Sequence, residues 1–285
     1  MVEYVRSVVA CAGGAIIACG LVTFAQAPSQ PSLPLAPLGR AGNAVIPAQE
    51  GWWRNADGTA TFLLGYFNRN ETVLEIPIGP NNRIEPGGPD MGQPTTFLPH
   101  RQSGMFAIKV PKDFGSKRLT WTLTANGQTV SIPLWLNPPY VVDPFRNASN
   151  GNTPPRIKFD PAGPEHVAGP TAIATKVDAS TNVPLSLPLW FVDAAETVGH
   201  PAAEGGRGRG SAVKVSWSKY RGPGAVKFEP QSQAFAELQG KAVATATFSS
   251  PGSYVIRAQV NDASGEGGGG DQCCWTSAHV AVQVK

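Results

Sequence analysis

Short segments in which every second residue is apolar recur along this chain, and they constrain its fold more than any other feature. In the first half they are Phe62, Leu64 and Tyr66; Leu74, Ile76 and Ile78; and Phe106, Ile108 and Val110. Successive side chains of a β-strand point to opposite faces, so this pattern predicts strands with one buried face. Glycines and prolines, 32 and 27 of them, separate the segments and break long helices. We therefore expect an all-β chain.

One hairpin can be assigned in register. Residues 119–134 alternate on both sides of Asn126-Gly127, a dipeptide that favours a two-residue type I′ turn. Counting outward from this turn pairs Leu123 with Val130, Trp121 with Ile132, and Leu119 with Leu134. All three apolar pairs lie on one face, so turn chemistry and hydrophobic phase agree.

The second half repeats the pattern. Its alternating runs are Leu185 to Phe191, Val213 to Trp217, Tyr254 to Val260, and Val280 to Val284. Several short strands bounded by turn residues are typical of a two-sheet sandwich. The chain is therefore expected to hold two tandem β-sandwich domains behind an N-terminal signal segment.

The N-terminus is typical of an export signal. Arg6 precedes an apolar run from Val8 to Val22, and Thr23-Phe24-Ala25 has the small residues that signal peptidase prefers. We favour cleavage after Ala25, because cleavage after Ala27 would leave a proline behind the cut. Lipidation at Cys19 and an uncleaved anchor are the alternatives. Each of them exports the rest of the chain.

The proline-rich stretches suggest the domain boundaries. We predict a signal peptide at 1–25, a linker at 26–43, a sandwich at 44–145, a linker at 146–153 and a second sandwich at 154–285. The length of 285 residues suits two domains. A formal net charge of +3 is too small and scattered for nucleic-acid binding. We expect membrane contact only through the signal segment or a lipid on Cys19.

Two runs of the second half resemble a known family. They are Trp217 followed by Gly222-Pro223-Gly224, and Pro251-Gly252-Ser253-Tyr254 followed by Asp262. Both look like the polycystic-kidney-disease (PKD) and cadherin-like branch of bacterial immunoglobulin-like domains, over about residues 154–285. The resemblance implies that Trp217 packs between the sheets and that Tyr254 leads into the next strand. It implies an immunoglobulin-like fold and no reaction, so we expect two tandem immunoglobulin-like β-sandwich domains. The two bridging cysteines of antibody domains are missing.

No stretch carries a strong catalytic or cofactor signature. Residues 265–270 spell the glycine fingerprint of dinucleotide sites, but a strand follows where a helix would have to begin. The four histidines are widely separated, and no nucleophile elbow or carboxylate pair stands out. We therefore expect a protein that is not an enzyme and binds no cofactor.

The candidate binding residues of the first domain lie in loops. Residues 79–104 are expected to form one long proline-rich loop between two strands, and loops of this length are often functional. This loop carries Arg83, Glu85, Asp90, His100 and Arg101. A binding role and a mere surface loop both remain open. Trp52 and Trp53 offer an indole that can stack on a sugar, although alternation sends one of the two into the core.

In the second domain, the loops after strands 185–192 and 254–261 should emerge at one end. They bring together Asp193, Glu196, His200, Arg207, Arg209, Asp262, Glu266, Asp271, Cys273 and Cys274. Solvated glycine-rich loops are the simplest interpretation. Calcium held by Asp193, Asp262, Glu266 and Asp271 is the weaker alternative. Cys273 and Cys274 can form a vicinal disulfide, bridge to another protein, or stay reduced.

These observations predict an exported, non-catalytic interaction or structural module of the cell envelope. We expect it to be secreted, periplasmic or at the cell surface, with an envelope protein or a glycan as its partner. A carbohydrate-binding accessory module is the alternative, followed by a secreted hydrolase whose site is built from loops.

Overall fold

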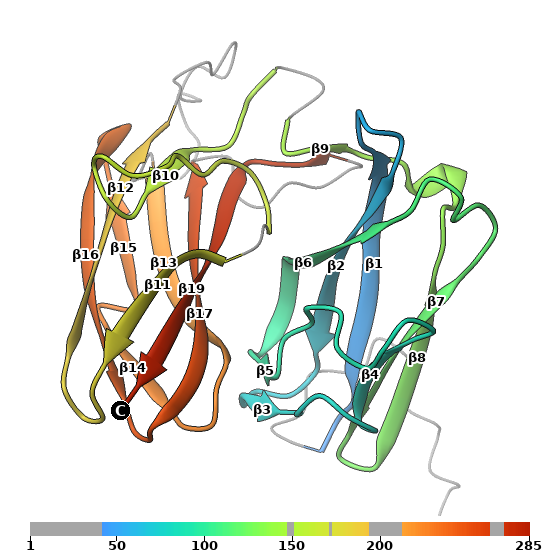
Figure 1. Ribbon diagram of the computed structural model, residues 1–285, viewed down its shortest axis with the longest axis horizontal. Coiled ribbons are helices and arrows are strands. Elements are labelled where there is room, and N and C mark those ends of the chain that lie inside the picture. The colour runs from blue at the N-terminus through green and yellow to red at the C-terminus, as the bar shows by residue number, and fades with distance from the viewer. Residues whose placement is uncertain (1–41, 147–150, 171–172, 194–212, 263–270) are drawn as a thin grey trace, which may run out of the picture. The chain divides into compact units, whose positions relative to one another are not determined.

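The computed structural model describes residues 42–146, 151–170, 173–193, 213–262 and 271–285 (Figure 1). These parts are strands and connecting loops, with one short 3-10 turn at Pro138–Tyr140. The prediction of an all-β chain is confirmed. Residues 38–285 form one compact unit. The predicted signal peptide, with Cys19, lies outside the described residues. Within the described residues, no helix is long and apolar enough to cross a membrane.

The first sandwich is built from β1 to β8. One sheet has the order β1-β2-β6, with β1 at Val45–Arg54, β2 at Ala60–Asn68 and β6 at His100–Val110. The other has the order β4-β7-β8, with β4 at Asn82–Glu85, β7 at Leu119–Ala125 and β8 at Gln128–Leu134. The short strands β3 (Leu74–Glu75) and β5 (Thr96–Phe97) pair with each other.

Aromatic side chains from both sheets fill the first core. The rings of Phe106 and Trp121 meet edge to face with their centroids 5.0 Å apart, which joins β6 to β7. The predicted hairpin is confirmed, since β7 and β8 pair in the expected register. Asn126 and Gly127 have φ angles of 51° and 73°, as a type I′ turn requires.

The second sandwich also has two facing sheets (Figure 1). The first has the order β10-β12-β16-β14, formed by Arg156–Lys158, Leu185–Val192, Gln239–Phe248 and Val226–Glu229. The second has the order β11-β19-β17-β13-β15, formed by Ile173–Ala179, Trp275–Val284, Gly252–Asp262, Val213–Arg221 and Ser232–Phe235. This division of strands between two sheets is the immunoglobulin-like arrangement. Strand β11 runs parallel to β19 at the sheet edge.

The two aromatic positions implied by the family resemblance are confirmed. Trp217 on β13 is 2% exposed and Tyr254 on β17 is 1% exposed, and both belong to the second core. The Tyr254 hydroxyl donates to the carbonyl of Ser250 at 2.8 Å, which closes a tyrosine corner at the start of β17. A Cβ at Gly222 would collide with the Tyr254 ring, so only glycine fits there.

The segment that follows the first sandwich pairs with the second. Strand β9 (Asp143–Pro144) lies parallel to β18 (Asp271–Gln272), which directly precedes the cysteine pair. The domain boundaries expected from the prolines stay a prediction.

The expectation of one unbroken loop over residues 79–104 was wrong, because this segment contains β4 and β5. Strand β4 pairs with β7 and places Ile84 opposite Trp121. Ile84 is its only apolar residue, so no alternating pattern marks the strand. The strand expected over Leu74, Ile76 and Ile78 is shorter than its alternating pattern predicts. Strand β3 ends at Glu75, because prolines follow at positions 77 and 80 and cannot donate the hydrogen bonds of a strand ladder.

We expect Trp217→Ala to lower the free energy of unfolding by about 3–5 kcal/mol, because it leaves a cavity between the two sheets. Val183→Ala, at a valine that is 54% exposed, is the matched control and should change stability by less than about 0.5 kcal/mol. Chemical denaturation of both variants measures the difference. A Trp217 variant as stable as the wild type would contradict the packing.

Candidate functional site

The two sandwiches meet where β13 ends. The pairing of β13 with β17 shifts register between Lys219 and Arg221, which makes Tyr220 the extra residue of a β-bulge. Tyr220 lies three positions after the core residue Trp217, so alternation points it out of its own sandwich, and it packs in the core of the first one, where it is 2% exposed. The bulge sets Arg221 opposite Val255, which also packs against the first core.

Tyr220 is held at both its ends. Its hydroxyl donates a hydrogen bond to the carbonyl of Gly92, and its own carbonyl accepts one from the Thr95 amide at 3.1 Å. Its ring packs on that of His279 with centroids 4.2 Å apart. Burial raises the pKa of the Tyr220 phenol, so this group stays a neutral donor.

Arg221, the next residue, forms a two-pronged ion pair with Asp90. Its Nη1 and Nη2 atoms lie 3.0 and 2.8 Å from the two carboxylate oxygens, and Nε donates to the Gln93 carbonyl at 2.8 Å. The Arg221 hydrogen bonds hold the pKa of Asp90 below its ordinary value. Lys219 adds a third link, with Nζ 2.7 Å from a carboxylate oxygen of Glu75.

The receiving segment, residues 89–95, is shaped by its own side chains. The Gln93 amide, fully buried, donates to the Pro89 carbonyl and accepts from the Met91 amide at 2.8 Å. An oxygen of Asp90 accepts the Gly92 amide at 2.9 Å, which forms an Asx turn. The loop thus presents its carbonyls and one carboxylate to β13 in a preset conformation.

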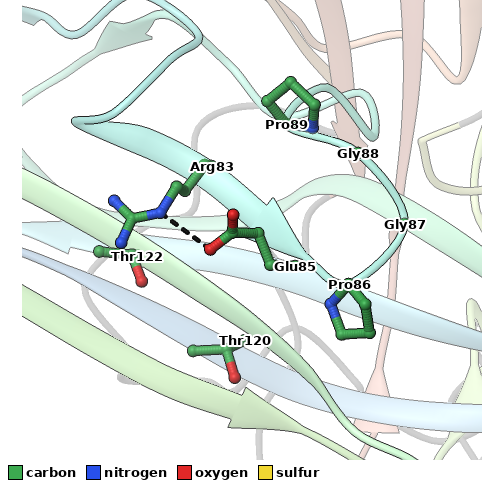
Figure 2. Close-up of a pocket in the computed structure, with 8 residues that line it drawn as sticks. All are labelled: Arg83, Glu85, Pro86, Gly87, Gly88, Pro89, Thr120 and Thr122. Carbon is green, nitrogen blue, oxygen red and sulfur yellow. Dashed lines mark hydrogen bonds and ion pairs between the residues drawn. The ribbon is translucent and has the colours of Figure 1, made fainter.

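A separate open hollow of about 630 Å³ lies on the outer face of β4 and β7 (Figure 2). Arg83 and Glu85 project from β4 and pair at 2.9 Å, while Thr120 and Thr122 stand on the adjacent strand. The loop from Pro86 to Pro89 bounds the other side. Guanidinium and hydroxyl groups beside proline rings suit a neutral polar ligand, because Glu85 balances the charge of Arg83.

The other loop residues predicted to bind do not join this hollow. Arg101 on β6 pairs with the buried carboxylate of Glu50 at 2.7 Å, and the second oxygen of Glu50 accepts the Gly104 amide at 2.7 Å. His100 is exposed at the start of β6, with a φ angle of 66°. The five predicted residues therefore lie in three places: Arg83 and Glu85 at the hollow, Asp90 at the junction, and His100 with Arg101 on β6.

Trp52 and Trp53 have different environments, as alternation along β1 requires. Trp52 is buried and its indole N–H donates to the Asn137 carbonyl at 2.7 Å. Trp53 is half-buried, donates to Asn55 Oδ1 at 3.1 Å and meets the ring of Phe145 edge to face. At most Trp53 offers part of an indole to a ligand, and a sugar-stacking role stays a prediction.

The predicted acidic end of the second sandwich is described in part. Glu196, His200, Arg207, Arg209 and Glu266 lie outside the described residues, as does the side chain of Asp271. Asp193 and Asp262 are near one another. Burial, and next the negative charge of Asp262, raise the pKa of Asp193 to about 7. Asn152 donates from its amide nitrogen to Asp262 Oδ2 at 2.6 Å.

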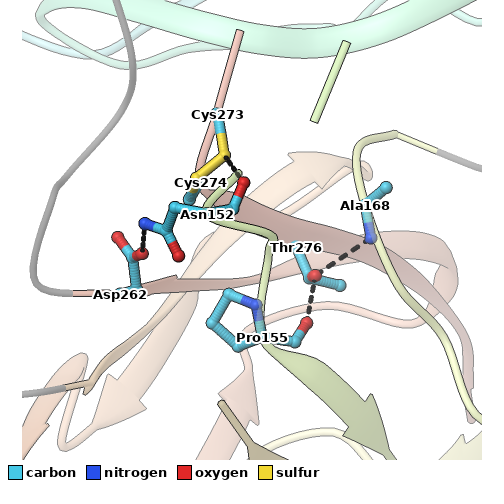
Figure 3. The surroundings of a disulfide bond; sticks show 7 residues. All are labelled: Asn152, Pro155, Ala168, Asp262, Cys273, Cys274 and Thr276. Carbon is cyan, nitrogen blue, oxygen red and sulfur yellow. Dashed lines mark hydrogen bonds between the residues drawn. A yellow bond between two sulfur atoms is a disulfide. The ribbon is translucent and has the colours of Figure 1, made fainter. Parts of the chain in front are cut away.

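The cysteine pair lies beside Asp262 and is buried just before β19 (Figure 3). The sulfurs of Cys273 and Cys274 are bonded to each other, and the Cys273 sulfur is 3.4 Å from the Asn152 carbonyl oxygen. The Cys274 carbonyl accepts the Asp262 amide at 3.2 Å. The hydroxyl of Thr276 next along the strand accepts the Ala168 amide and donates to the Pro155 carbonyl. A redox role of Cys273 and Cys274 stays a prediction.

Sequence reasoning missed the junction residues Tyr220 and Arg221. Both fall in the run that resembles PKD-like domains, where an alternating strand predicts one core and one solvent side chain. A bulge at Tyr220 leaves no mark in the spacing of apolar residues. Sequence reasoning also missed the roles of Glu50 and Asn152, because their hydrogen-bond partners are distant in sequence.

Comparisons with known proteins show remote likeness only. No family model matches the chain, and the search of curated proteins found no match. The D00-D0 domain of intimin is 13% identical, with 89% of this chain and 98% of that chain covered and a TM-score of 0.26. The S-layer protein rSbsC(31-844) is 12% identical over 85% of this chain and 28% of its own, with a TM-score of 0.24. A titin fragment, A168169, is 14% identical, with 84% and 98% covered and a TM-score of 0.22.

Asp193 makes folding depend on pH. Its pKa is about 7 when folded, against about 3.9 for an aspartate in an unfolded chain, so the folded state binds the proton more tightly. The resulting stabilisation is complete below about pH 4 and is lost as the pH rises to about 7. We expect Asp193→Asn to be more stable than the wild type at pH 8, by about 1–2 kcal/mol, since water screens part of the effect.

Urea melts of both proteins from pH 4 to pH 8 measure this difference, which should grow with pH. A constant difference would contradict the role of Asp193. Thermal melts with and without millimolar calcium test the metal prediction, because a bound ion raises the melting temperature of the wild type by mass action and that of Asp193→Asn less. A wild-type melting temperature that does not change with calcium would contradict the prediction of a calcium site.

Proposed function

We propose that this protein is an exported, non-catalytic module of the cell envelope whose two sandwiches act as one stiff body. The observation that carries the proposal is the junction at Tyr220 and Arg221. Neighbouring domains joined only by a linker move relative to one another by default. Here a side chain of one sandwich completes the core of the other, which favours a spacer or scaffold over two independent binding units.

The use of charged groups supports the same function. Asp90, Arg83 and Arg101, three residues singled out for binding, each have a carboxylate or guanidinium partner within 3.0 Å. Their charges therefore serve to hold loops and sandwiches in place. The predicted export signal and the resemblance to PKD and cadherin-like domains are in keeping with an extracytoplasmic scaffold, and we include membership of that branch in the proposal.

A carbohydrate-binding accessory role is the second candidate. The hollow beside Arg83 and Thr122 favours it, because paired polar side chains and proline rings suit a neutral sugar. A glycan array without signal would remove this candidate and would leave the scaffold proposal intact.

Stiffness can be tested by calorimetry and small-angle scattering. We expect the wild type to unfold in one transition and to keep one radius of gyration at all salt concentrations. Tyr220→Ala should lower the free energy of unfolding by about 3 kcal/mol, because it removes the Tyr220 ring from the first core. It should also split the unfolding transition in two, because the two sandwiches would no longer share a core. Lys214→Ala, at an exposed lysine of the same strand, is the matched control.

A double-mutant cycle of Arg221→Lys and Asp90→Asn should give a coupling energy of about 1 kcal/mol. A wild type with two separate transitions would contradict the single body. Recovery of the mature chain from the cytoplasm of the producing cell would contradict the export.

A further inference from the structure

The outer face of sheet β10-β12-β16-β14 carries a row of three side chains. Strand pairing sets Lys158 of β10 beside Trp190 of β12, and Trp190 beside Lys241 of β16. The Lys241 ammonium lies over the indole, 4.7 Å from the ring centroid. Inward alternation of Leu189 and Phe191 into the core leaves Trp190 pointing outward, where it is half-buried. One indole is therefore flanked by two amines on the outer face of the sheet.

Exposed aliphatic side chains surround this row. Val192 on β12 is 38% exposed and Val243 on β16 is 42% exposed. These are two of the nine large hydrophobic residues that are exposed within the described part of the chain. Their clustering around one tryptophan marks an apolar patch with a basic rim. We call this surface the Trp190 face.

The Trp190 face carries four basic side chains. Arg156 and Lys158 extend from β10, Lys241 from β16 and Lys227 from β14. The acidic groups nearby are Glu229, paired with Lys227 at 2.7 Å, Glu165, 3.9 Å from Arg156, Asp160, two residues after Lys158, and Glu237 on the turn before β16. No acid stands on the three-residue row itself, so an anion that approaches it meets two amines.

We propose that the Trp190 face docks onto an anionic lipid surface. Indole is favoured at the boundary between hydrocarbon and headgroups, and lysines can bury their chains there while their amines reach the phosphates. Each basic residue near such a surface adds about 1 kcal/mol of attraction. A soluble acidic glycan would match the amines but would leave the valines in water. A flat bilayer surface satisfies both.

This inference extends the proposed envelope function by naming a surface that the scaffold would contact besides its own signal segment. It does not depend on the stiffness of the junction. Vesicle binding tests this proposal and calorimetry tests the scaffold proposal, so a negative result in one measurement does not contradict the other proposal.

The test uses the full chain and two kinds of vesicle, phosphatidylcholine alone and phosphatidylcholine with about one third phosphatidylglycerol. We expect binding to the anionic vesicles that weakens with salt. Lys158→Glu with Lys241→Glu should weaken it at least tenfold. Lys112→Glu with Lys214→Glu makes the same change of charge at exposed lysines elsewhere and should weaken it far less. Residues 1–41 are present in every variant, so their contribution cancels.

A second measurement places the tryptophan. Brominated phosphatidylglycerol should quench the fluorescence of the wild type, and Trp190→Phe should abolish most of that quenching while keeping the melting temperature. Equal loss of binding in both double variants, or equal quenching with and without Trp190, would overturn the proposal. Binding to polyglutamate or polygalacturonate as tight as to vesicles, with no quenching, would assign the face to an acidic polymer instead.

Discussion

Insertion of Tyr220 into the first sandwich is the interaction on which the rest of the structure depends. An aromatic ring that leaves its own sheet gains stability only if another core surrounds it and its hydroxyl finds a hydrogen-bond partner. The carbonyl of Gly92 is that partner. Residues 89–95 must therefore keep one shape, and Gln93, buried within the loop, holds it from inside.

The pairing of charges follows from the same constraint. Arg221 lies next to Tyr220 and is brought against the first sandwich, where a guanidinium without partners would lose hydration at a cost. Asp90 and the Gln93 carbonyl replace the lost water. Glu50, whose side chain is almost fully buried, has the equivalent arrangement with Arg101 and the Gly104 amide. In both places a residue that resembled part of a binding loop holds the protein together.

Local rules predicted much of the fold. The turn at Asn126-Gly127 and the phase of β7 and β8 depend on residues close in sequence, so the register of this hairpin could be written down in advance. The positions of Trp217 and Tyr254 followed from the resemblance to PKD-like domains. Strand β4 escaped prediction because only Ile84 marks its buried face, and its paired residues on β7 are 35 or more positions away in the chain. The candidate sites fared worse, since partners such as Asp90 and Arg221 are 131 positions apart.

The sequence by itself determined that this protein is built of strands, because a period of two in apolar residues can bury one face in no other regular structure. It also determined the two aromatic anchors of the second core. Only the tertiary structure decided what lies beside what. Alternation shows that Trp190 points away from Leu189, but the order of strands in the sheet sets Lys158 and Lys241 on its two sides. Alternation places Tyr220 on the outer face of β13, but only the packing of the two sandwiches gives that face a core to enter, and the bulge between Lys219 and Arg221 sets Arg221 opposite Val255 on the same side.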